Sequence, residues 1–108
     1  MNIEIKLGQF GLTEEEIKKI ISIFSKYPAV KTAIIFGSRA KGNYRQYSDI
    51  DIALTGTDLS LTTQQLIESE IDDLLLPYKF DFAILEKIKN LNLINHIERV
   101  GKLLYSSN

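Results

Sequence analysis

Apolar residues recur at the spacing of helices in three segments of the chain. The first segment begins with Thr13 and Glu16, whose separation is that of a capping box. The second begins at Thr62 or Thr63 and the third at Asn90, which are residue types that cap helices. The residues expected on the buried helical faces are Ile17, Ile20, Ile21 and Phe24 in the first segment, Leu66, Ile67, Ile71, Leu74 and Leu75 in the second, and Leu93, Ile94, Ile97 and Val100 in the third.

Shorter apolar runs between these segments have the pattern of strands. KTAIIF, residues 31–36, contains β-branched residues and stops at a glycine, as expected of a buried strand. DIDIAL, residues 49–54, and FDFAIL, residues 80–85, alternate between polar and apolar positions, and KLLY, residues 102–105, could add a last short strand. The order of elements predicts a small α/β (α+β) fold in which helices pack on a sheet.

Aspartates occupy the polar positions of two predicted strands. Because side chains alternate along a strand, Asp49 and Asp51 share the face opposite the apolar residues, and Asp81 has the same parity in the later strand. If these strands are neighbours, roughly 5 Å apart, the three carboxylates converge. Carboxylates at such a short distance repel one another, which raises their pKa values unless a cation lies among them. Oxygen ligands suit Mg²⁺ or Mn²⁺, and a pair of such ions about 4 Å apart would serve phosphoryl or nucleotidyl transfer.

The stretch GSRAKG, residues 37–42, lies just before these aspartates in the sequence. Gly37 would let the backbone approach a ligand closely, with N–H groups that bind phosphate oxygens. Ser38 adds a hydroxyl and could cap a short helical turn, while Arg39 and Lys41 could neutralise a triphosphate. Taken alone, the stretch is more typical of a solvated loop than of a phosphate site, and the aspartates could simply face solvent. Together, the stretch and the aspartates favour a phosphate site.

Composition narrows the class of protein further. The chain has 108 residues, of which 44% are hydrophobic and 25% charged, as in an ordinary folded domain. We therefore expect one domain over residues 1–108, with no separate domain for an acceptor. The net charge of -1 predicts no direct nucleic-acid binding, and the lack of cysteine excludes thiolate chemistry. No apolar run suits a signal peptide or a membrane span, so we expect a cytoplasmic protein without membrane contact.

The compound motif resembles a known family. Gly37-Ser38, ten intervening residues, Asp49-x-Asp51 and a third aspartate on a later strand resemble the signature of the DNA polymerase β-like nucleotidyltransferase superfamily. GSRAKGNYRQYSDIDIAL, residues 37–54, is especially similar to its minimal nucleotidyltransferase branch. The resemblance implies a small mixed-sheet nucleotidyltransferase fold and Mg²⁺-dependent transfer of a nucleoside monophosphate from a nucleoside triphosphate, with release of pyrophosphate. ATP as the substrate is implied by the resemblance alone, because no residue pattern here distinguishes adenine from other bases.

The same resemblance implies a role for each residue of the motif. Asp49, Asp51 and Asp81 are the implied catalytic residues and metal ligands, with Asp81 also helping to deprotonate the attacking hydroxyl. The implied phosphate ligands are Gly37 and Ser38 at the β and γ phosphates, and Arg39 and Lys41 at the leaving pyrophosphate. We expect the single histidine, His96, on a polar helix flank without a catalytic role.

Members of the minimal branch are commonly encoded beside a HEPN-domain ribonuclease, and the pair resembles a toxin–antitoxin system. The resemblance implies that this chain is the antitoxin and adenylylates a tyrosine of the HEPN toxin. Two alternatives stay open. The chain could neutralise its partner by binding alone, or it could transfer a nucleotide to a small hydroxylated molecule such as an aminoglycoside.

Overall fold

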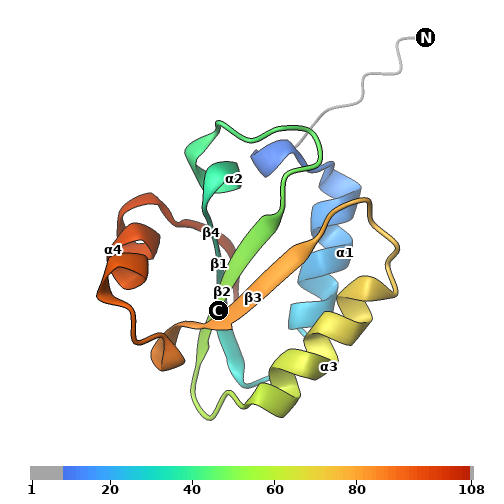
Figure 1. Cartoon of the computed structure of the whole chain (residues 1–108). Coiled ribbons are helices and arrows are strands. Elements are labelled where there is room, and N and C mark those ends of the chain that lie inside the picture. The colour runs from blue at the N-terminus through green and yellow to red at the C-terminus, as the bar shows by residue number, and fades with distance from the viewer. Residues whose placement is uncertain (1–8, 108) are drawn as a thin grey trace, which may run out of the picture.

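The computed structural model describes residues 9–107, and a four-stranded sheet lies at its centre (Figure 1). The strands appear where the alternating and apolar runs predicted them. The helices follow the three amphipathic segments, with one further short helix after the first strand. In chain order the elements are η1 (Gln9–Gly11), α1 (Glu14–Phe24), β1 (Val30–Phe36), α2 (Ser38–Lys41), β2 (Ile50–Gly56), α3 (Leu61–Asp72), β3 (Phe80–Ile84), η2 (Leu85–Lys87), α4 (Leu91–Val100) and β4 (Lys102–Ser106).

The sheet is mixed, with the strand order β3-β2-β1-β4. Strand β1 runs antiparallel to both β2 and β4, whereas β2 and β3 are parallel. Parallel strands need a crossover connection, and α3 supplies it between β2 and β3. This mixed α+β architecture is the one that the sequence predicted, and it sets the two aspartate-bearing strands side by side.

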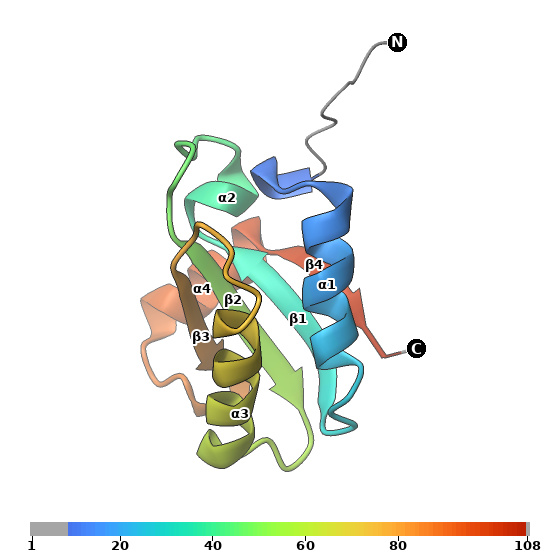
Figure 2. The same cartoon turned by 90° about the vertical axis from the view of Figure 1, so that its right-hand side faces the viewer.

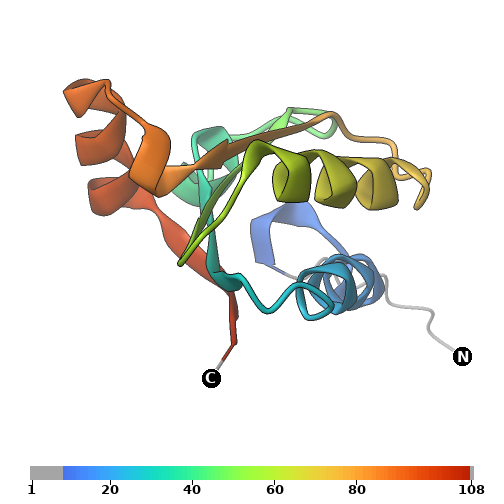
Figure 3. The ribbon, with the colours of Figure 1, turned by 90° about the horizontal axis from the view of Figure 1, so that it is seen from below.

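Helices cover both faces of the sheet. Helices α1 and α3 pack on one face and α4 on the other, as the edge-on views show (Figures 2 and 3). Helix α2 and the loop before β2 lie together at one end of the sheet (Figure 1). Helix α2 therefore borders the sheet face that α4 covers. Side chains on this face, near α2, can form a site.

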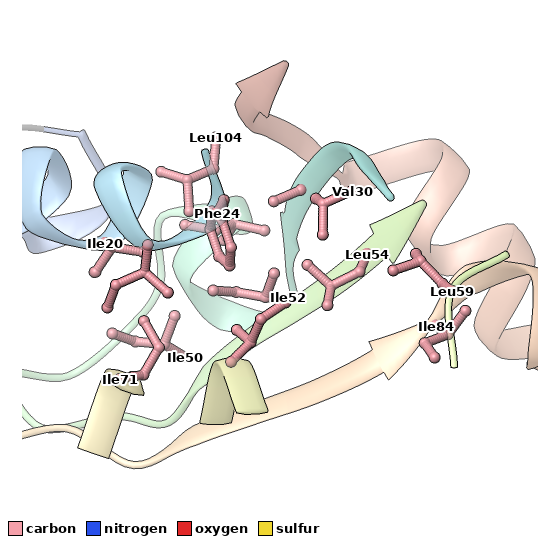
Figure 4. Packing of buried hydrophobic residues seen from close by; sticks show 14 of the residues in the cluster. Ile20, Phe24, Val30, Ile50, Ile52, Leu54, Leu59, Ile71, Ile84 and Leu104 are labelled. Atoms are coloured by element: carbon pink, nitrogen blue, oxygen red, sulfur yellow. The ribbon is translucent and has the colours of Figure 1, made fainter. Parts of the chain in front are cut away.

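The hydrophobic core lies between the sheet and the pair α1 and α3 (Figure 4). Ile50, Ile52 and Leu54 of β2 are fully buried there, in the same cluster as Ile20 and Phe24 of α1. Full burial of such side chains stabilises a fold by roughly 1.5–3 kcal/mol each. The alternation in β2 therefore fixes its register, because a slip of one residue would turn these three side chains out of the core and the aspartates into it.

Helix starts agree with the predicted caps in two of three cases. Thr13 and Glu16 form the capping box of α1, and Asn90 accepts hydrogen bonds from the first turn of α4. Helix α3, in contrast, is capped by Ser60, whose hydroxyl accepts from the Thr63 N–H at 3.1 Å. The expected caps Thr62 and Thr63 were wrong because Ser60 is the last extended residue before the helix.

Two leucines assigned to the core are instead exposed. Leu66 is 52% exposed, since Ile67 and Ile71 define the buried stripe of α3 and Leu66 lies about 100° around the helix from Ile67. Leu75 is 88% exposed, because α3 ends at Asp72 and Leu75 has a left-handed backbone with φ 56. In the part of the chain that the structure describes, none of the helices has the length and apolar character needed to cross a membrane.

Candidate active site

The three predicted aspartates come together at the start of β2 and β3. Asp51 and Asp81 are direct partners in the parallel register of the two strands, so their side chains share one face. Asp49 stands one residue before β2. Asp51 is half-buried, while Asp49 and Asp81 are exposed to solvent. Asp51 and Asp81 thus lie on the face under α4, opposite the core, and Asp49 lies at its edge, just before β2.

The environment of Asp51 disfavours its negative charge. Burial raises the pKa of the Asp51 carboxyl above its ordinary value, the carboxylates of Asp81 and Asp49 raise it further, and His96 has a smaller opposing effect. A divalent cation bound between these oxygens would relieve both burial and repulsion, and carboxylate oxygens are ligands suited to Mg²⁺. Within residues 9–107, no group of three or more acidic, histidine or cysteine side chains is positioned to hold a metal ion.

Substitution Asp51→Asn is expected to stabilise the metal-free protein at pH 7. A carboxyl whose pKa is higher in the folded than in the unfolded state weakens folding once the pH exceeds the folded pKa, and this weakening is absent below the unfolded pKa. The stability difference between variant and wild type should therefore shrink as the pH falls from 7 towards about 4. Thermal denaturation in chelator over this range measures it, and a variant less stable than wild type at pH 7 would contradict the account.

The Gly-Ser turn contacts the carboxylate site directly. Gly37 has φ 73 and ψ -154 and precedes the first turn of α2, and a Cβ at this position would lie 2.5 Å from Asp51 Oδ2. Ser38 is the first residue of α2, so Gly37 and not Ser38 occupies the cap position that the sequence had suggested for the serine. The first N–H groups of a helix have no partner within it. The turn and the carboxylates therefore form one continuous polar surface.

The two basic residues of α2 lie in different environments. Lys41 is exposed at the end of the helix, and its role at the pyrophosphate stays a prediction. Arg39 is only 2% exposed. Its guanidinium donates to the backbone carbonyl oxygens of three other residues, so these donors face the protein interior. The phosphate role of Arg39 stays a prediction as well, and its contacts point to another one, developed below.

His96 belongs to the site, although the sequence placed it on a polar flank. Its Nε2 accepts a hydrogen bond from the Gly37 N–H at 3.2 Å, and its ring meets Phe36 edge to face at 6.2 Å between centroids. In a neutral imidazole this bond places the proton on Nδ1. The signal in the sequence is that His96 lies between Leu93 and Ile97, at the border of the apolar face of α4.

Substitution His96→Phe should lower the free energy of unfolding by about 0.5–1.5 kcal/mol, the usual net contribution of one hydrogen bond. Phenylalanine keeps an aromatic ring against Phe36 but has no acceptor for the Gly37 N–H. Urea denaturation of the variant and the wild type measures the difference. Equal stability of the two proteins would show that the bond does not hold the turn.

Comparison with known proteins identifies the family to which this fold belongs. The family model for polymerase beta nucleotidyltransferases matches residues 18–108, which include the Gly-Ser turn and all three aspartates. The chain belongs to this family and carries a nucleotidyltransferase domain. No curated protein matches the chain.

Several solved structures share the fold. A toxin–antitoxin complex with AMP-PNP has a TM-score of 0.69 and 25% identity, and the match covers 83% of this chain and 73% of that one. The MntA–HepT toxin–antitoxin complex gives a TM-score of 0.65 at 22% identity, covering 87% and 73%. The tri-AMPylated HEPN toxin of Shewanella oneidensis with its MNT antitoxin gives 0.65 at 22% identity, covering 86% and 71%. The chain is thus similar in fold to proteins of toxin–antitoxin complexes.

Proposed function

We propose that the protein is a Mg²⁺-dependent nucleotidyltransferase that moves AMP from ATP to a hydroxyl group and acts as the antitoxin of a HEPN-domain ribonuclease. The observation that carries this proposal is the direct apposition of Gly37 and Asp51. Triphosphate oxygens bound at the turn would then lie beside carboxylates able to hold the metal. Nucleotidyl transfer requires this pairing of a phosphate site with a metal site.

The three aspartates share one role in the proposed reaction, and Asp81 has a second. Asp49, Asp51 and Asp81 would hold Mg²⁺, which typically takes one or two carboxylates together with substrate phosphates and neutralises their charge. Asp81 is exposed beside Asp51, so its carboxylate can also accept the proton of an incoming hydroxyl. Ser38 would offer its hydroxyl and N–H to a phosphate, whereas the Gly37 N–H already donates to His96 Nε2 and would have to exchange that bond for a phosphate oxygen. The exposure of Asp49 and Asp81 leaves the acceptor side of the site open to a macromolecule.

The proposed acceptor is a tyrosine of the HEPN partner. The AMP-PNP complex of a similar toxin–antitoxin pair supports an adenine nucleotide as substrate. The tri-AMPylated toxin of the Shewanella oneidensis complex supports a protein acceptor. The resemblance to the minimal nucleotidyltransferases adds the tyrosine and the neighbouring gene as the source of the partner. Cytoplasmic location follows from the same pairing.

Mass spectrometry of the partner tests this acceptor. The product of the neighbouring gene is incubated with this protein, ATP and Mg²⁺, and its peptides are compared with those from a reaction in chelator. A tyrosine peptide that gains AMP only with Mg²⁺ supports the proposal. A stable complex without modification would favour an antitoxin that acts by binding alone, and modification of an added aminoglycoside in place of the partner would favour a small-molecule acceptor.

A further inference from the structure

The buried side chain of Arg39 connects three segments that are distant in sequence. Its Nη1 donates to the Phe10 carbonyl oxygen at 2.9 Å. Its Nη2 donates to the carbonyl oxygens of Gln46 at 3.1 Å and Ser48 at 2.9 Å. The guanidinium also lies against the faces of Tyr44 and Tyr78, with 4.8 and 4.9 Å to the ring centroids. Among the described residues Arg39 forms no ion pair, so carbonyl dipoles and aromatic faces stabilise its charge.

These contacts hold the loop that leads into β2, the strand that carries Asp51. Gln46 and Ser48 come immediately before Asp49, and the Ser48 hydroxyl accepts from the Arg45 N–H at 2.7 Å within the same loop. Fixing the Ser48 carbonyl fixes the peptide unit that joins Ser48 to Asp49. The guanidinium of Arg39, on α2, is therefore bonded to the backbone directly before Asp49.

The backbone around Phe10, which Arg39 contacts, has an unusual conformation and little free space. Phe10, whose carbonyl accepts from Arg39, has φ 66, a backbone conformation that is unfavourable for a residue with a side chain. Gly11 follows with φ +75, and a Cβ there would lie 2.8 Å from Arg39 Nη1 and collide with the ring of Tyr44. The backbone of η1 is thus shaped to receive the guanidinium, which indicates a built contact and not a chance one.

We propose that Arg39 is a positioning residue, which clamps the 43–48 loop through Gln46 and Ser48 and thereby holds Asp49 in place for metal binding. The proposal deepens the proposed function of the site and rests on it for the catalytic consequence. Arginine suits this role because its planar fork donates in several fixed directions and stacks on aromatic rings, which lysine does not reproduce. The role differs from that of a phosphate ligand, since the guanidinium donors are already directed at carbonyls.

Hydrogen exchange of the loop tests the clamp without any catalytic assay. In Arg39→Met and Arg39→Lys, the Arg45 and Ser48 amides, which are hydrogen-bonded inside the loop, should exchange at least about tenfold faster than in wild type. Lys41→Met is the matched control, because it removes a cation from the same short helix but touches none of these carbonyls, and its loop should exchange at the wild-type rate. Unchanged exchange in both Arg39 variants would overturn the proposal.

Steady-state kinetics then separates positioning from phosphate binding. The clamp predicts that Arg39→Lys lowers kcat by about tenfold or more and weakens Mg²⁺ activation, while the KM for ATP stays within about twofold. Wild-type kinetics in Arg39→Lys would overturn the proposal, because a positive charge at this position would then be sufficient without the hydrogen bonds of the guanidinium. Tyr44→Leu, which removes one stacking face, offers a milder variant if the Arg39 variants unfold, and its loop should also exchange faster. Fast exchange in the variants together with an inactive wild type would refute the proposed function and leave the clamp intact.

Discussion

The double substitution Asp49→Asn with Asp51→Asn is expected to abolish nucleotide transfer while leaving the fold intact. The asparagines keep the shape of the side chains but remove the charges that would hold Mg²⁺ against the triphosphate. Metal stabilisation of a phosphoryl transition state amounts to several kcal/mol, so the rate should fall by about 10³-fold or more. Incorporation of label from α-labelled ATP into the acceptor measures this loss.

A matched control separates the site from a general effect of charge. Asp72 and Asp73 are exposed at the end of α3, and their replacement by asparagine changes the net charge by the same amount. That control should transfer nucleotide at the wild-type rate. The site variant should be no less stable than wild type in thermal denaturation, because it removes carboxylates that repel one another. Undiminished labelling by the site variant would contradict the metal site.

The substitution Gly37→Ala is expected to damage both stability and transfer. The backbone of Gly37, with φ 73 and ψ -154, lies in a region populated almost entirely by glycine. Placing another residue in this conformation should lower the free energy of unfolding by about 1–3 kcal/mol. The added methyl group would also meet Asp51 Oδ2 at 2.5 Å and displace the carboxylate from its place beside the turn. Chemical denaturation and labelling of the acceptor measure the two effects.

Gly42→Ala is the control that separates backbone strain from the contact with Asp51. Gly42 also has a positive φ of 87, but a Cβ there would meet nothing within 4 Å. Both variants should lose stability, whereas a large loss of transfer should be confined to Gly37→Ala. If the two variants retained the same activity, the apposition of the turn and Asp51 would have no part in the reaction.

Much of the fold followed from local patterns that the structure confirmed. The alternation of Ile50, Ile52 and Leu54 defined β2 and its buried face, because only one register places all three in the core. The caps at Thr13 and Asn90 placed two helix starts. In the same way, the parity of Asp51 and Asp81 predicted their shared face, and the parallel pairing of β2 with β3 brought them together.

Contacts between segments that are distant in sequence could not be predicted from such local patterns. The spacing of GSRAKG does not indicate that Arg39 turns inward, because its partners Phe10 and Tyr78 lie far from it in sequence. His96 reaches Gly37 only because α4 covers the face opposite the core, and the helix period alone does not choose that face. The tertiary packing thus decides which polar residues lie in the site and which stabilise the backbone around it.

Parallel reactions with ATP labelled at the α or the γ phosphate distinguish nucleotide transfer at this site from phosphoryl transfer. The protein, its HEPN partner and Mg²⁺ are incubated with each label, and protein-bound and free label are separated. The account predicts α label on the partner and γ label released as pyrophosphate in equal amount. Protein-bound γ label, or no transfer of either label, would contradict it.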